Sequence, residues 1–306
     1  MEALRIHLFG QVRIFNAETA EPAKVTHHVQ ALLAYLLLHR HRSHSREVLA
    51  ELFWGDHPQS RARGAMNTTL WRLRQILEPT EALRGTFLLT ATSGEIAINP
   101  ATSYWLDAAT FEDHSLRALQ QPVEGMQETD AARLKAAVQL YTGELLEGYY
   151  EDWALRERER MHQLYLNSLV HLMLYYSHRH AYKESLGWGQ RVLDHEPLRE
   201  DVQREMMRLY QVSGQRTRAL QQYELCRQVL AEEIGIAPMV ETQALHAAIL
   251  KGVVVQQVAV YAAVQSHHED VLSTLRLALQ SFDETRAYLQ RVVQLLEQAV
   301  EPYQSP

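Results

Sequence analysis

The sequence predicts a mostly α protein: an N-terminal α+β winged helix, then an all-α tetratricopeptide-like repeat region, then a coiled-coil-like C-terminal helix. Three observations carry this prediction. Short β-forming runs flank three helical patterns in the first hundred residues. Matching residues then recur at an interval of 34, and apolar residues alternate in steps of three and four near the C-terminus. The predicted regions are residues 1–100, 101–252 and 253–306.

Composition sets the broad class of protein. The chain has 306 residues, of which 46% are apolar, enough for about two packed domains. No apolar run reaches the length of a membrane span, and the opening MEALRIHLFG lacks the basic and apolar regions of a signal peptide. The single cysteine, Cys226, excludes an internal disulfide. These features favour a cytoplasmic protein that does not contact a membrane.

Charge is distributed unevenly along the chain. The formal net charge is −7, but residues 1–100 carry +2 and residues 101–306 carry −9. Binding of nucleic acid depends on the local field of a surface. The acidic total therefore does not exclude it.

The first elements follow from local signals. The run LRIHLFGQVRIF is rich in β-formers and predicts two or three short strands through about Val25, with Gly10 at a turn. A long apolar helix follows from about His28 to Leu38. Ser45 is expected to cap the next helix, REVLAELFW, whose end is marked by Gly55.

A third helix, from His57 to Leu77, is the main candidate for a functional surface. Pro58 suits its first turn, because that position needs no amide donor. Its apolar residues at intervals of four, three and four predict one buried face: Met66, Leu70, Leu73 and Leu77. The segment contains four arginines and no acidic residue. The candidate DNA-binding residues are Arg61, Arg63, Asn67, Thr68, Trp71, Arg72, Arg74 and Gln75.

These side chains suit the major groove of DNA, because phosphates need positive charge and base edges need forked or amide donors. The residues expected at base edges are Asn67, Thr68, Trp71, Arg72 and Gln75. Those expected at phosphates are Arg61, Arg63 and Arg74. The alternative interpretation is that this charged helix face is exposed to solvent and binds nothing.

Two short β-runs, Phe87–Thr90 and Glu95–Ile98, are separated by Ala91–Gly94 and predict a hairpin. The order of elements is therefore strands, three helices and a hairpin. This is the order of a winged helix, in which the second and third helices form a helix-turn-helix and the third enters the major groove.

The middle region reads as helix from Asp107 to about Leu250, with a 34-residue period. Gly214, Ala219 and Tyr223 fall at the offsets of a tetratricopeptide unit. A stack of helix pairs with a concave face is therefore expected. The pairs of residues 34 apart are Tyr176 and Tyr210, Ser185 and Ala219, and Val192 and Cys226.

Both regions resemble a known family, the SARP group (Streptomyces antibiotic regulatory proteins) of bacterial transcription factors. The segments LRIHLFGQVRI, ALLAYLLLH, SREVLAELFWGD and ARGAMNTTLWRLRQIL resemble its OmpR-type DNA-binding domain. The segments YWLDAATFE, LYTGELLEGYYEDWALRERERMHQLY and HEPLREDVQREMMRLYQVSGQRTRALQQYELCRQVLAEEIGIAP resemble its bacterial transcriptional activator domain. The chain departs from the family at Thr26–His28, where basic residues are usual, and at Gly94–Ile96, where a Gly-Tyr pair is usual.

The resemblance implies a transcription activator that binds direct repeats in double-stranded DNA near a promoter. It also implies contact with RNA polymerase, through the sigma subunit and the alpha C-terminal domain. An enzyme is not expected, and neither is a cofactor.

Other interpretations stay open. The chain could be a repeat scaffold whose winged helix binds protein, which the acidic Glu95 in the hairpin favours. It could also be gated by a small anionic effector, although core packing explains aromatic residues at helical spacing better. The residues considered for an effector pocket are Tyr149, Tyr150, Trp153, Arg156, Arg158, Arg160, Tyr175 and Tyr176.

The C-terminal segment has a coiled-coil pattern between Leu272 and Val300, interrupted only by Arg286. It could pair two copies into a homodimer, or fold back on the helical repeats. The sequence slightly favours association.

Catalytic motifs are absent from the sequence. It has no phosphate-binding loop, no G-x-S-x-G, no H-E-x-x-H and no cysteine pair. His39, His41 and His44 lie close together but lack cysteine or nearby carboxylate partners, so a metal site is not expected.

Overall fold

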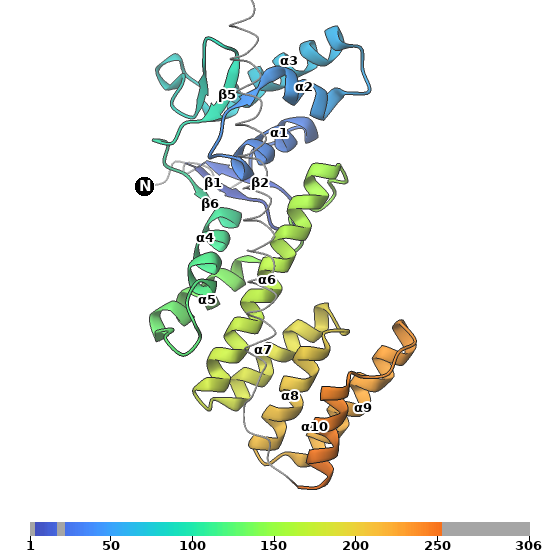
Figure 1. Cartoon of the computed structure of the whole chain (residues 1–306). Coiled ribbons are helices and arrows are strands. Elements are labelled where there is room, and N and C mark those ends of the chain that lie inside the picture. Colours follow the sequence, from blue (N-terminus) through green and yellow to red (C-terminus); the bar gives the residue numbers. More distant parts are fainter. Residues whose placement is uncertain (1–3, 17–21, 253–306) are drawn as a thin grey trace, which may run out of the picture. The chain divides into compact units, whose positions relative to one another are not determined.

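The structure, a computed structural model, describes residues 4–16 and 22–252 (Figure 1). It is mostly helical with small sheets near the N-terminus, as the sequence predicted. The predicted C-terminal helix, residues 253–306, lies outside the described residues. The chain divides into two compact units, residues 1–202 and 203–306.

The elements in order are β1 (Leu4–His7), β2 (Arg13–Asn16), α1 (His27–Leu38), β3 (His44–Ser45), α2 (Arg46–Trp54), α3 (Gln59–Leu77), the short 3₁₀ helix η1 (Glu81–Leu83), β4 (Leu88–Thr90), β5 (Glu95–Ile98), β6 (Trp105–Leu106), α4 (Asp107–Leu119), α5 (Glu128–Leu140), α6 (Asp152–His178), α7 (Tyr182–His195), α8 (Glu200–Val212), α9 (Arg216–Glu233) and α10 (Val240–Leu250).

The first sheet has the strand order β2-β1-β6. β1 pairs antiparallel with β2, and the turn between them passes through Gly10, whose φ of +73° favours glycine. On its other edge β1 pairs in parallel with β6, with Arg5 opposite Trp105. The sequence did not predict β6. The start of the helical region is thus built into the N-terminal sheet.

The first helix of the winged-helix region, α1, is almost entirely buried. Nine of the twelve residues of α1 are buried, which explains why it is apolar on nearly all sides. Helix α3 packs on both α1 and α2. The predicted cap of α2 is confirmed, because the Ser45 hydroxyl accepts the backbone N–H of Glu47 at 3.2 Å.

Gly55 ends α2 as predicted, but for a different reason. Its φ of −58° is right-handed, so the left-handed conformation common at helix ends is not used here. A Cβ at Gly55 would lie 2.7 Å from the carbonyl oxygen of Glu51. The position therefore requires glycine for space and not for its dihedral angles.

The predicted hairpin forms the second sheet, with the strand order β3-β5-β4. β4 and β5 pair antiparallel, with Leu88 opposite Ile98. The first run starts at Leu88, one residue later than predicted. β3, which was not predicted, joins β5 just before α2 begins. We call the β4–β5 hairpin, residues 88–98, the wing.

Helices α4 to α7 complete the first unit. α4 packs on α5 and α6, and α5 also packs on α6. α6 is 27 residues long, and α7 returns beside it (Figure 1). In the second unit, helices α8, α9 and α10 share a core that consists of Met207, Ala219, Tyr223, Leu245 and Ile249.

The 34-residue period is a structural period. Ser185 in α7 and Ala219 in α9 are both fully buried. The turns that precede these helices also match, because His180 has φ +58° and Gly214, 34 residues later, has φ +76°. In each turn the next amide donates to the carbonyl five residues back, at 2.9 Å after His180 and 2.8 Å after Gly214. The helix pairs α6–α7 and α8–α9 are therefore repeats of one motif.

Candidate nucleic-acid interface

Helix α3 is oriented by its apolar face. The four residues predicted to be buried are all buried, and Ala62 joins them. Pro58 is the residue just before the helix and does not lie in its first turn. Because this face packs against α1 and α2, the opposite face of α3 points to solvent. The buried residues predicted for this face are Met66, Leu70, Leu73 and Leu77.

Most of the candidate DNA-binding residues lie on the open face of α3. Arg74 is half-buried, and the other seven are exposed. Trp71 is 60% exposed and lies next to Arg72 in the chain, so a flat aromatic ring and a guanidinium are presented together. The exposed candidates are Arg61, Arg63, Asn67, Thr68, Trp71, Arg72 and Gln75.

Two of these residues have contacts within the protein. Arg63 Nη2 lies 2.8 Å from Glu47 Oε1 of α2, and both side chains are more than half exposed. Such an exposed pair contributes at most about 1 kcal/mol, so Arg63 can exchange it for a phosphate. Thr68 Oγ1 donates to the carbonyl of Gly64 at 3.0 Å, and the hydroxyl oxygen can still accept.

The last turn of α3 is bonded to the wing, which sequence reasoning missed. Glu78 directly follows the helix and is 3% exposed. Its Oε1 accepts the backbone N–H groups of Phe87 and Leu88, both at 2.8 Å. One helical turn earlier, Arg74 Nη2 donates to Thr90 Oγ1. Only the position of Glu78 at a helix end was visible in the sequence.

The wing adds no positive charge to this surface. Residues 88–98 contain no lysine or arginine. Their one acidic side chain, Glu95, accepts a hydrogen bond from Ser43 Oγ at 3.2 Å and stays exposed. The cationic character of the candidate interface therefore comes from α3.

The winged helix is joined to α4 through Asp107. Both carboxylate oxygens accept the N–H of Leu8, at 2.9 and 3.0 Å, and one also accepts the N–H of Phe9 at 3.1 Å. Asp107 is 2% exposed, and burial raises its pKa to about 6 although these bonds act in the opposite direction. The two N–H groups belong to the residues just after β1, so Asp107 at the start of α4 bonds the end of that strand.

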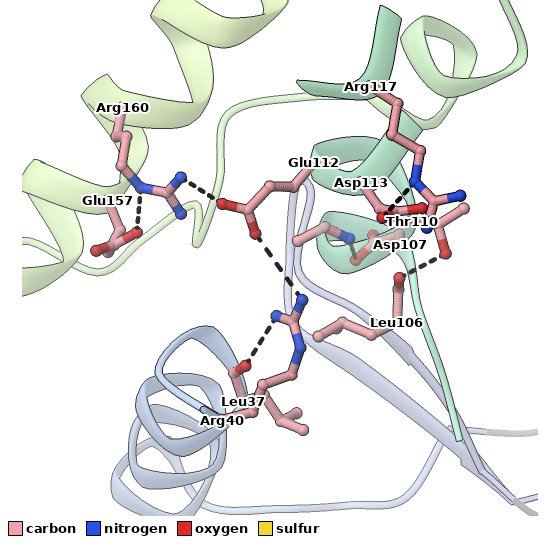
Figure 2. A network of polar contacts seen from close by, with 11 residues as sticks. Leu37, Arg40, Leu106, Asp107, Thr110, Glu112, Asp113, Arg117, Glu157 and Arg160 are labelled. Atoms are coloured by element: carbon pink, nitrogen blue, oxygen red, sulfur yellow. Dashed lines mark hydrogen bonds and ion pairs between the residues drawn. The ribbon is translucent and has the colours of Figure 1, made fainter. Parts of the chain in front are cut away.

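A second connection runs through Glu112 of α4, which lies between two arginines (Figure 2). Glu112 is 2.5 Å from Arg160 of α6 and 4.0 Å from Arg40, which follows α1. Arg40 also donates to the carbonyl of Leu37 at the end of α1 at 3.3 Å, and Arg160 pairs with Glu157 at 2.9 Å. Helix α1 is thus tied to both α4 and α6 by partly buried charges.

The residues considered for an effector pocket do not converge on one. Tyr149, Trp153 and Tyr175 are buried, and the Trp153 ring packs edge-on against Tyr35 and Phe53. A groove of about 270 Å³ between α5, α6 and α7 includes only one of the eight, Tyr176. The other residues that line it are Lys135, Glu184, Gly187, Trp188 and Arg191.

Arg158 has a structural role. Its guanidinium donates to the carbonyls of Leu145, Leu146 and Tyr149 at 2.8, 2.6 and 2.8 Å. These carbonyls belong to the loop before α6, in which Leu146 has a left-handed φ of +55°. Arg158 therefore holds a strained loop in place.

Within residues 4–16 and 22–252, no group of three or more His, Cys, Asp or Glu side chains is arranged to hold a metal ion. His39 and His44 are near each other, with ring centroids 6.1 Å apart, but no third ligand joins them in that part of the chain. No helix among these residues combines the length and the apolar character needed to cross a membrane.

Comparison with known proteins shows that part of this chain matches a known family. Residues 106–250 match the family described as bacterial transcriptional activator domain. The regulatory protein AfsR of Streptomyces coelicolor is 29% identical over 252 residues, which cover 81% of this chain and 24% of AfsR. AfsR of Streptomyces griseus is 27% identical, over 82% of this chain and 25% of that protein. The chain thus spans about a quarter of the length of these relatives.

A solved structure shares the fold. Mycobacterium tuberculosis EmbR, in complex with a low-affinity phosphopeptide, superposes with a TM-score of 0.67 at 20% identity, over 90% of this chain and 72% of EmbR. The matched family consists of transcriptional regulators and not of enzymes. These matches confirm the resemblance to the SARP group. Residues 106–250 match the bacterial transcriptional activator domain family, and the chain is similar to the AfsR regulators over about four-fifths of its length.

Proposed function

We propose that this protein is a sequence-specific transcription activator that binds direct repeats in promoter DNA through α3. The observation that carries the proposal is the open face of α3, which presents arginine, amide and aromatic side chains and contains no acidic residue. Homology to a family of transcriptional activators supports it.

The chemistry of each side chain suggests its role. A forked guanidinium such as Arg72 matches the two acceptors of guanine, and the amide of Asn67 matches adenine. Thr68, Trp71 and Gln75 lie on the same exposed face and complete the base-edge group. Arg61 and Arg63 lie nearer the start of α3, where they suit the phosphates on the rim of the groove.

The helical repeats are the proposed site of contact with RNA polymerase, through its sigma subunit and alpha C-terminal domain. The junction supports this role, because Asp107 and Glu112 join the winged helix to α4 and α6. DNA bound at α3 would therefore also fix the position of the first helices of the activator domain. Homodimer formation through residues 253–306 remains part of the proposal.

The first test is a fluorescence-anisotropy titration of a nonspecific duplex at two salt concentrations. Affinity should fall by about 10³-fold or more between about 50 and 200 mM salt if six or more phosphates are contacted. Arg61→Ala should flatten the salt slope by about one unit. Arg133→Ala, which removes an exposed arginine of α5, is the matched control and should change nothing.

The second test uses a promoter fragment found by genome-wide mapping of bound sites. Arg72→Ala should weaken binding to it by about 1–3 kcal/mol and relax the preference at one base pair. If the wild-type protein shows no salt-dependent binding to either duplex, the scaffold interpretation replaces this one. The net charge of −7 and the cation-free wing are the observations that favour the scaffold.

A further inference from the structure

The joint between α3 and the wing contains two polar side chains from the same end of α3. Glu78 accepts the N–H groups of Phe87 and Leu88 through one oxygen, and Arg74 donates to the hydroxyl of Thr90. The three acceptor and donor sites lie within four consecutive residues at the start of the wing. Two separate attachment points one helical turn apart fix the position of β4 and also its rotation relative to α3.

The environment of these side chains makes them a fixed part of the domain. Glu78 is 3% exposed, and a buried carboxylate that loses its donors is costly. Arg74 is half-buried, and its Nε atom is buried and forms no hydrogen bond among the described residues. Its guanidinium therefore lies against the wing, unlike those of the exposed Arg61 and Arg72 on the same helix.

The wing needs such support for an electrostatic reason. Residues 88–98 contain no cation, so attraction to phosphates cannot hold the hairpin against DNA. Its location beside the duplex must then be set by bonds within the protein. The side chains of Arg74 and Glu78 form the hydrogen bonds that join the wing to the end of α3.

We propose that Arg74 and Glu78 are positioning residues, which set the wing relative to α3, and that Arg74 does not contact a phosphate. This inference rests on the proposed function for its effect on DNA binding. It assigns Arg74 a role different from the one its charge suggests. It also makes the hydroxyl of Thr90, an uncharged group, important for affinity.

The test combines two measurements on the full chain. Hydrogen exchange of the wing amides reports whether the joint is held, with or without DNA. Thr90→Val keeps the shape and β-propensity of the residue but removes the acceptor, and Glu78→Gln removes the charge. We expect each variant to speed exchange of the Leu88 amide about tenfold, while Arg133→Ala leaves it unchanged.

The second measurement is the salt dependence of duplex binding. Thr90→Val and Arg74→Ala should each weaken binding about 3- to 10-fold, the value of one hydrogen bond, with the same salt slope as the wild type. The variant that combines Arg74→Ala with Thr90→Val should bind the duplex no more weakly than Arg74→Ala alone, because the two changes remove the same hydrogen bond. A slope flattened by about one unit in Arg74→Ala, together with a neutral Thr90→Val, would overturn the inference.

The two proposals fail in different ways. Faster wing exchange with unchanged DNA affinity would show that the joint holds the wing but does not affect DNA binding; it would refute the role of Arg74 and Glu78 in binding and leave the proposed function intact. Absence of salt-dependent binding by the wild-type chain would refute the proposed function. Unchanged exchange of the wing amides in Thr90→Val and Glu78→Gln would show that these side chains do not hold the wing, whatever the DNA affinity of the variants.

Discussion

Replacement of Arg158 by lysine should destabilise the protein strongly although the charge is kept. The Arg158 guanidinium donates to three carbonyls of one loop at 2.6–2.8 Å, and its side chain is 14% exposed. The same loop pairs with the N-terminal region, because Gly10 N–H donates to the carbonyl of Glu144 and Leu146 N–H donates to that of Leu8, both at 2.8 Å. The loop therefore connects the first sheet to α6.

The magnitude follows from the number of bonds. A hydrogen bond to a charged group contributes about 1.5–3 kcal/mol, and lysine, with one terminal nitrogen, can replace about one of the three. The loss of the other two predicts that Arg158→Lys lowers the free energy of unfolding by about 3 kcal/mol. For a unit of this size the melting temperature should fall by about 6–12 °C.

The assay is equilibrium urea unfolding followed by tryptophan fluorescence, because the buried Trp153 lies near the start of the same helix. Arg156→Lys is the matched control, since Arg156 is exposed on α6 and should tolerate the change. A loss of less than about 1 kcal/mol in Arg158→Lys would show that water replaces the lost bonds, and the reasoning from buried carbonyls would be wrong.

Three further predictions concern stability. Burial lowers the pKa of His171 to about 4, so the stability from this neutral ring is complete above pH 6.5 and is lost as pH falls to 4, by about 3 kcal/mol. His171→Phe should therefore flatten the dependence of the urea midpoint on pH in that window. His180→Gly should stabilise by about 0.5–1 kcal/mol, because φ +58° strains a residue with a Cβ, and Gly214→His should destabilise by a similar amount; melting curves that move in the same direction would exclude equivalent turns. Ser45→Ala should cost about 1 kcal/mol in a thermal melt through loss of its cap to α2, and a neutral result would mean that solvent satisfies the Glu47 amide.

The parts of the fold that sequence predicted are those with local causes. The spacing of apolar residues in α3 was enough to identify its buried face, because the helix repeats every 3.6 residues. Ser45 has the side chain that caps a helix, and it caps α2. The 34-residue period likewise needs only the sequence, because each repeat places the same kind of residue at the same contact.

Two strands could not be predicted, because they depend on distant partners. β3 and β6 are two residues long, and each exists because an edge of β5 or β1 is available to it. The bond from Leu8 to Asp107 joins residues 99 positions apart. Nothing in the residues around Asp107 distinguishes it from an ordinary acidic residue at a helix start.

The candidate interface shows the same division. The spacing of the apolar residues in α3 placed eight candidate residues away from its buried face, and seven of them are exposed because packing on α1 and α2 leaves that face open. This spacing could not show that β4 lies against the side of the helix at Arg74, since it describes one helix alone. Glu78 was missed because its donors, Phe87 and Leu88, are nine and ten residues away in another element.

The pairing of β6 with β1 limits how this protein can be divided. A winged-helix fragment that stopped at residue 100 would lose Trp105 and Asp107, and with them one of the two strands that neighbour β1 and the acceptor for two backbone amides. An unpaired strand edge promotes aggregation. Expression of the N-terminal part alone should therefore extend past Asp107. A chimaera that exchanges winged-helix regions between related proteins should carry this short strand with the region it completes.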